Sequence, residues 1–77
     1  MTLTIGEKLP TNFSQLIKME LDRDTINRLS DEFGIEYKEL KSILNRELKL
    51  TNKNFNLVTK LVREALKERR ERFPKDV

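Results

Sequence analysis

Apolar residues recur at helical spacing on both sides of a single glycine in the middle of the chain. Before the glycine, Leu29 and Phe33 lie one helical turn apart and share a face. After it, Leu40 and Ile43 form the inward stripe of a second helix. Gly34 itself can leave a helix through positive φ without a Cβ clash. Two short helices joined by a tight turn are the pattern of a helix-turn-helix unit.

The same periodicity extends to both flanks of this unit. Phe13, Ile17 and Leu21 follow one another at i, i+4 spacing and predict a preceding helix. Phe55 and Val58 begin the apolar stripe of a longer last helix. The predicted helices span residues 12–21, 26–33, 37–48 and 54–73. We therefore expect an all-α fold, a small helical bundle that contains a helix-turn-helix.

The domain boundaries follow from these helices. Residues 1–11 are expected to form an N-terminal arm or tail, residues 12–73 the helix-turn-helix domain with its long last helix, and residues 74–77 a tail. Thr25 is well placed to cap the helix that begins at Ile26.

Two segments could instead form strands. Leu3 and Ile5 alternate with polar residues, and the expected partner of such a strand is the same segment of a second subunit. Alternation at Ile17, Met19 and Leu21 also leaves open a strand followed by a helix-loop-helix, the order found in ribbon-helix-helix repressors. A helix is favoured there because the segment that follows is too short for that architecture.

Composition removes several classes of site. The 77-residue chain has no cysteine and no histidine, which excludes a zinc module, a thiol nucleophile and a histidine general base. Its two glycines cannot build a phosphate-cradling loop. We therefore expect no enzymatic activity, no cofactor and no metal. Because no apolar run approaches the ~20 residues that span a bilayer and no secretory signal is present, we expect a cytoplasmic protein without membrane contact.

Charge is distributed unevenly along the chain, although the net charge is only +3. Residues 1–37 carry four basic and seven acidic residues, whereas residues 38–77 carry twelve basic and six acidic residues. The sign changes where the second helix of the helix-turn-helix begins. A nucleic-acid-binding protein needs positive charge on the element that faces the phosphates, so this asymmetry favours double-stranded DNA as the partner.

The outward face of the predicted helix 37–48 and the loop after it hold the candidate DNA contacts. Lysine and arginine can donate hydrogen bonds to guanine or to phosphates, and asparagine can pair bidentately with adenine. Acidic Glu36, Glu39 and Glu47 lie near this face and would repel phosphates unless they are turned aside. The candidates are Tyr37, Lys38, Lys41, Ser42, Asn45 and Arg46 on the helix, and Lys49 and Lys53 in the loop.

One stretch, residues 25–45, carries a further set of residues at characteristic spacing. They are a capping residue, a small residue, a turn glycine and an apolar packing pair: Thr25, Ser30, Gly34, and Leu40 with Ile43. The stretch resembles the helix-turn-helix of the lambda-repressor/Cro-like family. That family usually has alanine in place of Ser30, and in place of Ile26 a glutamine that binds a phosphate. The resemblance implies a dimeric, sequence-specific DNA-binding transcriptional regulator, a repressor of phage or bacterial type.

The last helix carries an apolar stripe broad enough to cover the core and also to pack on another copy of itself. We expect Leu57, Leu61 and Leu66 to form the interface of a homodimer. Two other functions stay open. One is a small protein-interaction module such as an antirepressor, antitoxin or assembly adaptor, and the other is a non-specific DNA-binding architectural protein.

Overall fold

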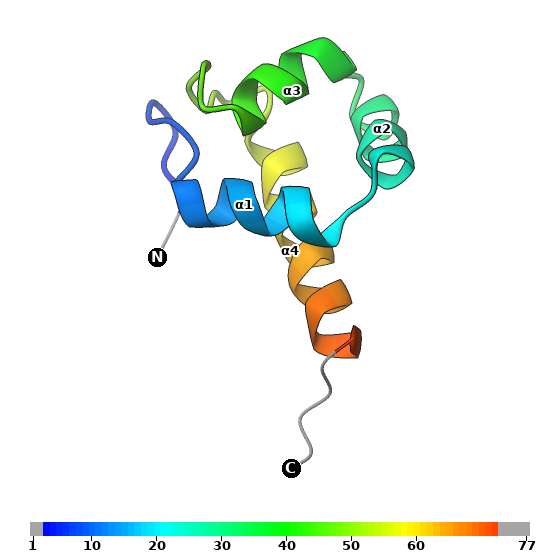
Figure 1. Ribbon diagram of the computed structural model, residues 1–77. Coiled ribbons are helices and arrows are strands. Elements are labelled where there is room, and N and C mark those ends of the chain that lie inside the picture. Colours follow the sequence, from blue (N-terminus) through cyan, green and yellow to red (C-terminus); the bar gives the residue numbers. More distant parts are fainter. Residues whose placement is uncertain (1–2, 73–77) are drawn as a thin grey trace.

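The computed structural model describes residues 3–72, and these form a bundle of helices without an extended sheet (Figure 1). The helices of the described residues are α1 (Thr11–Glu20), α2 (Arg23–Glu32), α3 (Tyr37–Leu44) and α4 (Phe55–Arg72). The predicted all-α fold is therefore confirmed. Phe73 and the predicted tail at residues 74–77 lie outside the described residues. Within the described part of the chain, no helix combines the length and the apolar character needed to cross a lipid bilayer.

The strand alternative for residues 17–21 is wrong, because α1 continues to Glu20. Helical spacing buries Ile17 and Leu21 together, whereas Met19 between them is 73% exposed. Strand alternation would have placed all three side chains on one face. The buried pair instead belongs to one stripe of a helix.

The first residues of α2 are capped by Asp22 rather than by the predicted Thr25. The Asp22 carboxylate accepts a hydrogen bond from the backbone N–H of Thr25 at 2.8 Å. Hydrogen bonds from the backbone and the side chain of Thr25 lower the pKa of the Asp22 carboxyl, with a smaller contribution from the charge of Arg28. Because an aspartate caps as well as a threonine, α2 begins at Arg23, three residues before the predicted start.

Helix α2 ends in a Schellman motif built on Gly34. This glycine has φ of 68°, and its N–H donates to the Asp31 carbonyl at 3.1 Å. The next N–H, of Ile35, donates to the Ser30 carbonyl at 3.0 Å. Fully buried Ser30 donates its hydroxyl back to the Ile35 carbonyl. The predicted glycine turn is present, and Ser30 closes it with a hydrogen bond as well as leaving room for the helix crossing.

Helix α3 ends at Leu44, four residues before the predicted end at residue 48. Arg46 adopts φ of 62°, a left-handed conformation that a continuing α-helix cannot contain. Its N–H donates to the Ile43 carbonyl at 3.0 Å, and the Glu47 N–H donates to the Ser42 carbonyl at 2.8 Å. This is a second Schellman motif, with an arginine in the position that glycine usually occupies.

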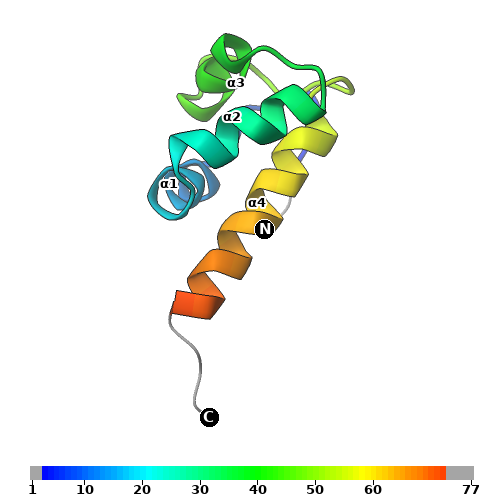
Figure 2. The ribbon, with the colours of Figure 1, turned by 90° about the vertical axis from the view of Figure 1, so that its right-hand side faces the viewer.

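A single apolar core joins all four helices of the described residues. Figures 1 and 2 show α4 running beneath the other helices, with its second half (orange) extending beyond them. Helices α1 and α2 pack on α4, and α3 packs on α1 and α2. At the start of α4, Thr51 and Asn54 exchange side-chain-to-backbone hydrogen bonds of 2.8 and 3.3 Å, as in a capping box.

Two of the three residues predicted for the homodimer interface lie instead in the core of the chain. Leu57 and Leu61 are fully buried within the chain and have no surface left for a partner. They belong to the core that α4 forms with α1 and α2. Leu66 follows the fully buried Ala65 and is 43% exposed.

The N-terminal arm pairs with its own chain, not with a second subunit as expected. The Gly6 N–H donates to the Leu50 carbonyl at 2.8 Å, and the Leu50 N–H donates to the Glu7 carbonyl at 2.9 Å. These bonds form an isolated antiparallel bridge between Lys8 and Lys49. Leu9 and Leu50 are both buried beneath the bridge. We call residues 6–9 and 48–50 together the arm–loop clip.

Candidate nucleic-acid interface

The helix-turn-helix consists of α2, the turn at residues 33–36 and α3. Figures 1 and 2 show that α2 and α3 cross steeply, because each is seen nearly end-on in one view and from the side in the other. Phe33 was expected to share the buried face of Leu29, but it is 39% exposed. Phe33 is the C-cap of α2, directly after the last helical residue, Glu32.

Two lysines lie on the exposed face of α3. Lys38 and Lys41 are three positions apart, so they lie on one side of the helix, and both are exposed. Ser42 beside them is half-buried. Tyr37 is also half-buried, and the guanidinium of Arg23 stands 5.6 Å from the centre of its ring. This cation–π contact joins the first turn of α2 to the first turn of α3.

The two residues predicted to end the outward face, Asn45 and Arg46, lie beyond α3 and make structural contacts. The Asn45 amide oxygen accepts a hydrogen bond from the Lys18 ammonium group of α1 at 2.9 Å. The Arg46 Nε donates to the backbone carbonyl of Leu9 in the arm at 2.8 Å. Both residues therefore hold the end of α3 against neighbouring segments. The amino group of Asn45 and the remaining N–H groups of Arg46 can still donate to a ligand.

A buried serine of α1 completes this support. The Ser14 hydroxyl donates to the carbonyl of Leu44, the last residue of α3. That carbonyl has no partner within the helix, because the last four carbonyls of any α-helix lack one. Ser14 and Lys18 lie one turn apart on α1 and contact adjacent residues at the end of α3. The i, i+4 spacing was visible in the sequence, but nothing in it identified the partner.

The predicted loop lysines have different surroundings. Lys53 lies 3.9 Å from the Glu39 carboxylate, measured from Nζ to Oε1. Lys49 forms the arm–loop clip opposite Lys8. Sequence reasoning missed Lys8 and Lys18, which the fold brings to this side of the molecule from distant parts of the chain.

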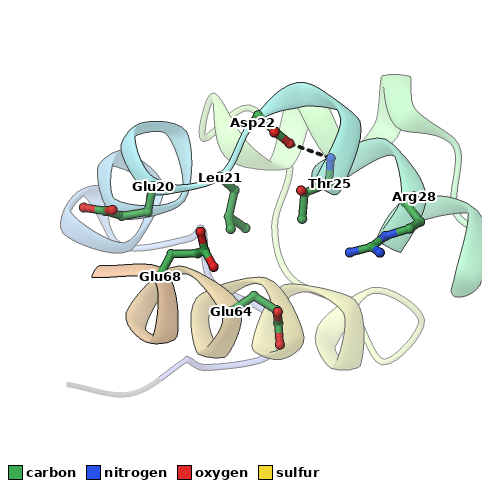
Figure 3. Close-up of a pocket in the computed structure, with 7 residues that line it drawn as sticks. All are labelled: Glu20, Leu21, Asp22, Thr25, Arg28, Glu64 and Glu68. Carbon is green, nitrogen blue, oxygen red and sulfur yellow. Dashed lines mark hydrogen bonds between the residues drawn. The ribbon is translucent and has the colours of Figure 1, made fainter. Parts of the chain in front are cut away.

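A polar pocket of about 200 Å³ lies between the α1–α2 connection and the second half of α4 (Figure 3). Its walls carry four carboxylates and one guanidinium, so the pocket is acidic and would repel phosphates. Within the described residues, no group of acids is arranged to hold a metal ion. The lining residues are Glu20, Leu21, Asp22, Thr25, Arg28, Glu64 and Glu68.

Exposed basic residues occur in two parts of the molecule. The lysines of α3 and of the arm–loop clip form one group. Arg63, Lys67, Arg69 and Arg70 form another group on α4, the helix that also supplies Glu64 and Glu68 to the acidic pocket. Comparison of the chain with protein-family models, with curated proteins and with solved structures finds no match.

Proposed function

We propose that this protein is a sequence-specific double-stranded DNA-binding regulator of the repressor type, which reads the major groove with α3. The observation that carries the proposal is the exposed face of α3, on which Lys38 and Lys41 stand side by side. The end of the same helix is fixed by Ser14 and Lys18. A surface that reads DNA bases must keep a fixed register on the duplex. A basic helix whose end is held rigidly meets this requirement.

The dimensions of α3 support this reading mode. An α-helix with its side chains is about 10–12 Å across, and the major groove is about 12 Å wide. Lys38 and Lys41 can donate to guanine O6 and N7, or to phosphates at the groove edge. Glu39 lies between them in sequence, and the positive charge of Lys53, 3.9 Å from its carboxylate, offsets part of its repulsion of DNA.

The homodimer belongs to this proposal. Two copies of α3 related by a twofold axis would contact half-sites one helical turn of DNA apart. Of the residues predicted for the interface, Leu66 keeps exposed apolar surface on α4. Contact through Leu66 would leave the exposed face of α3 uncovered in each subunit.

A binding selection from random duplex DNA at near-physiological salt tests the proposal. We expect enrichment of a palindrome. The variants Lys38→Ala and Lys41→Ala should then each lower affinity for the selected site by about 5- to 150-fold, the effect of losing one good base contact. Lys67→Ala is the matched control, because Lys67 is an exposed lysine of α4, away from α3. Thermal unfolding followed by circular dichroism checks that each variant keeps its fold.

The alternatives give different results in the same experiment. If retention on DNA disappears with added salt and no motif is enriched, the protein is a non-specific architectural DNA-binding protein. If no duplex is retained even at low salt, DNA is not the partner, and a protein-interaction module replaces the proposal. Equal affinities of the wild type and both α3 variants for the selected site would show that α3 does not read the bases.

A further inference from the structure

The arm–loop clip places two lysines directly opposite each other. In an antiparallel bridge, the side chains of facing residues point to the same side, with Cβ atoms about 5 Å apart. Lys8 and Lys49 are such a pair, and both are exposed. Facing pairs of like charge destabilise a ladder.

Within the described residues, neither lysine of this pair is held in an ion pair of the kind that Lys53 forms with Glu39 and Lys60 forms with Glu64. Both ammonium groups of this patch can therefore bind a ligand.

The patch is held firmly in spite of the repulsion. Buried Leu9 and Leu50 anchor the two segments, and backbone hydrogen bonds from Gly6 and to Glu7 join them. The Arg46 guanidinium fixes the arm further through the Leu9 carbonyl. The fold thus keeps a like-charge pair in place.

The arm–loop clip also lies beside the end of α3. The chain passes from α3 through Asn45 and Arg46 straight into residues 48–50, and Figure 1 shows the arm (blue) next to this loop. When a helix enters the major groove, the segments next to its ends face the sugar-phosphate backbone.

We propose that Lys8 and Lys49 together bind one phosphate of the DNA backbone beside the groove that α3 enters. This inference rests on the proposed function and adds to it a contact that is independent of base sequence. Both ammonium groups can reach a single phosphate because their side chains start about 5 Å apart on the same face. The negative charge of the phosphate relieves the repulsion between them. The arm therefore takes part in binding, although it is remote from α3 in sequence.

The test is a salt titration of binding by the full chain. The probes are the selected duplex and a duplex of the same length with scrambled sequence. The variants are Lys8→Gln, Lys49→Gln and the double variant, and Lys67→Gln is the matched control. Glutamine keeps most of the aliphatic stem of each lysine while it removes the charge.

We expect the double variant to weaken binding to both duplexes by the same factor, about eightfold at ~0.1 M salt. The slope of log affinity against log salt should become shallower by about 0.9, the value for one phosphate contact and not for two. The ratio of affinities for the two duplexes should not change. Without DNA, the melting temperature of the double variant should equal or exceed that of the wild type, because the repulsion is gone.

Three results for the double variant would overturn the proposal. The first is a salt slope and an affinity equal to those of Lys67→Gln. The second is a loss of affinity confined to the selected duplex, and the third is a melting temperature below that of the wild type. Failure of the proposed function is distinguishable, because the wild type itself would then show no preference for the selected duplex. A wild type that binds no duplex at all would overturn both proposals together.

Discussion

At the scale of single residues, two left-handed positions decide where the helices of the helix-turn-helix end. Gly34 and Arg46 occupy the same place in two Schellman motifs, with φ of 68° and 62°. Glycine adopts this conformation without a steric penalty, whereas an L-residue with a side chain is disfavoured there by roughly 1–2 kcal/mol. The hydrogen bond from Arg46 to the Leu9 carbonyl offsets part of that cost.

Replacement of Gly34 tests one physical effect, the strain of a left-handed backbone on a residue with a side chain. Replacing Gly34 with alanine should lower the free energy of unfolding by about 1–2 kcal/mol, because the left-handed backbone becomes strained. No atom lies within 4 Å of the position a Cβ would take, so packing adds nothing to this value. Urea denaturation measures the change. Gly34→Asn is the control and should lose less, because asparagine tolerates this conformation better than alanine. Equal stability of wild type and Gly34→Ala would contradict the backbone explanation.

Residue types explain which of these positions could be predicted from the sequence. A glycine between two periodic stretches signals a helix end, so the turn after α2 was predictable. An arginine in the same conformation gives no such signal, which is why α3 was predicted four residues too long. Asp22 and Thr25 are both good capping residues, and the choice between them depends on tertiary packing.

At the scale of elements, α1 fixes the end of the helix proposed to read DNA. Ser14 donates to the last carbonyl of α3, and Lys18 binds the next residue, Asn45. Together these contacts connect two helices that are not adjacent in sequence. They also explain why Asn45 and Arg46 are only partly available for DNA, since each already serves to position α3.

The serine contact can be tested by removing one hydroxyl. Ser14→Ala should lower the free energy of unfolding by about 1–3 kcal/mol, because a buried carbonyl loses its partner. Chemical denaturation of the variant measures this loss. Gln15→Ala, the exposed neighbour on the same helix, should change stability by less than about 0.5 kcal/mol. Similar values for the two variants would mean that the Ser14 hydrogen bond does not stabilise the fold.

Contacts between elements mark the limit of prediction from the sequence. Helical periodicity identified α1, α3 and α4, and the turn glycine identified the end of α2. The partner of the arm was missed because residues 48–50 are too short for a strand signal and lie far from the arm in sequence. For the same reason, Lys8 and Lys18 were absent from the predicted DNA-binding residues. The width of the apolar stripe on the last helix did not show which of its leucines are buried within the chain and which are exposed. Leu57 and Leu61 are buried, and Leu66 is exposed.

At the scale of the whole molecule, the bundle completes its core within one chain and leaves a few apolar side chains at the surface. Leu66 on α4 is 43% exposed, and Met19 on α1 is 73% exposed. The proposed homodimer needs such a surface away from α3.

Sedimentation of two matched variants tests the homodimer. The wild type should sediment as a dimer, and Leu66→Glu should sediment as a monomer, because a carboxylate cannot be buried at the interface without a partner. Met19→Glu places the same charge on a more exposed apolar position and should remain dimeric. Circular dichroism should show unchanged helix content in both. A monomeric wild type would rule out the homodimer, and loss of the dimer only in Met19→Glu would move the interface to α1.

The arm–loop clip also has a consequence for the order of folding. Its bridge joins residues 8 and 49, more than forty positions apart, and α1, α2 and α3 all lie within the loop that it closes. Closing a loop of that length costs chain entropy. The few hydrogen bonds of the bridge offset this cost only after the enclosed helices have folded and brought the two ends of the loop together. The clip should therefore be the last part of the native state to form. Its two lysines would meet only on a chain that has already finished folding.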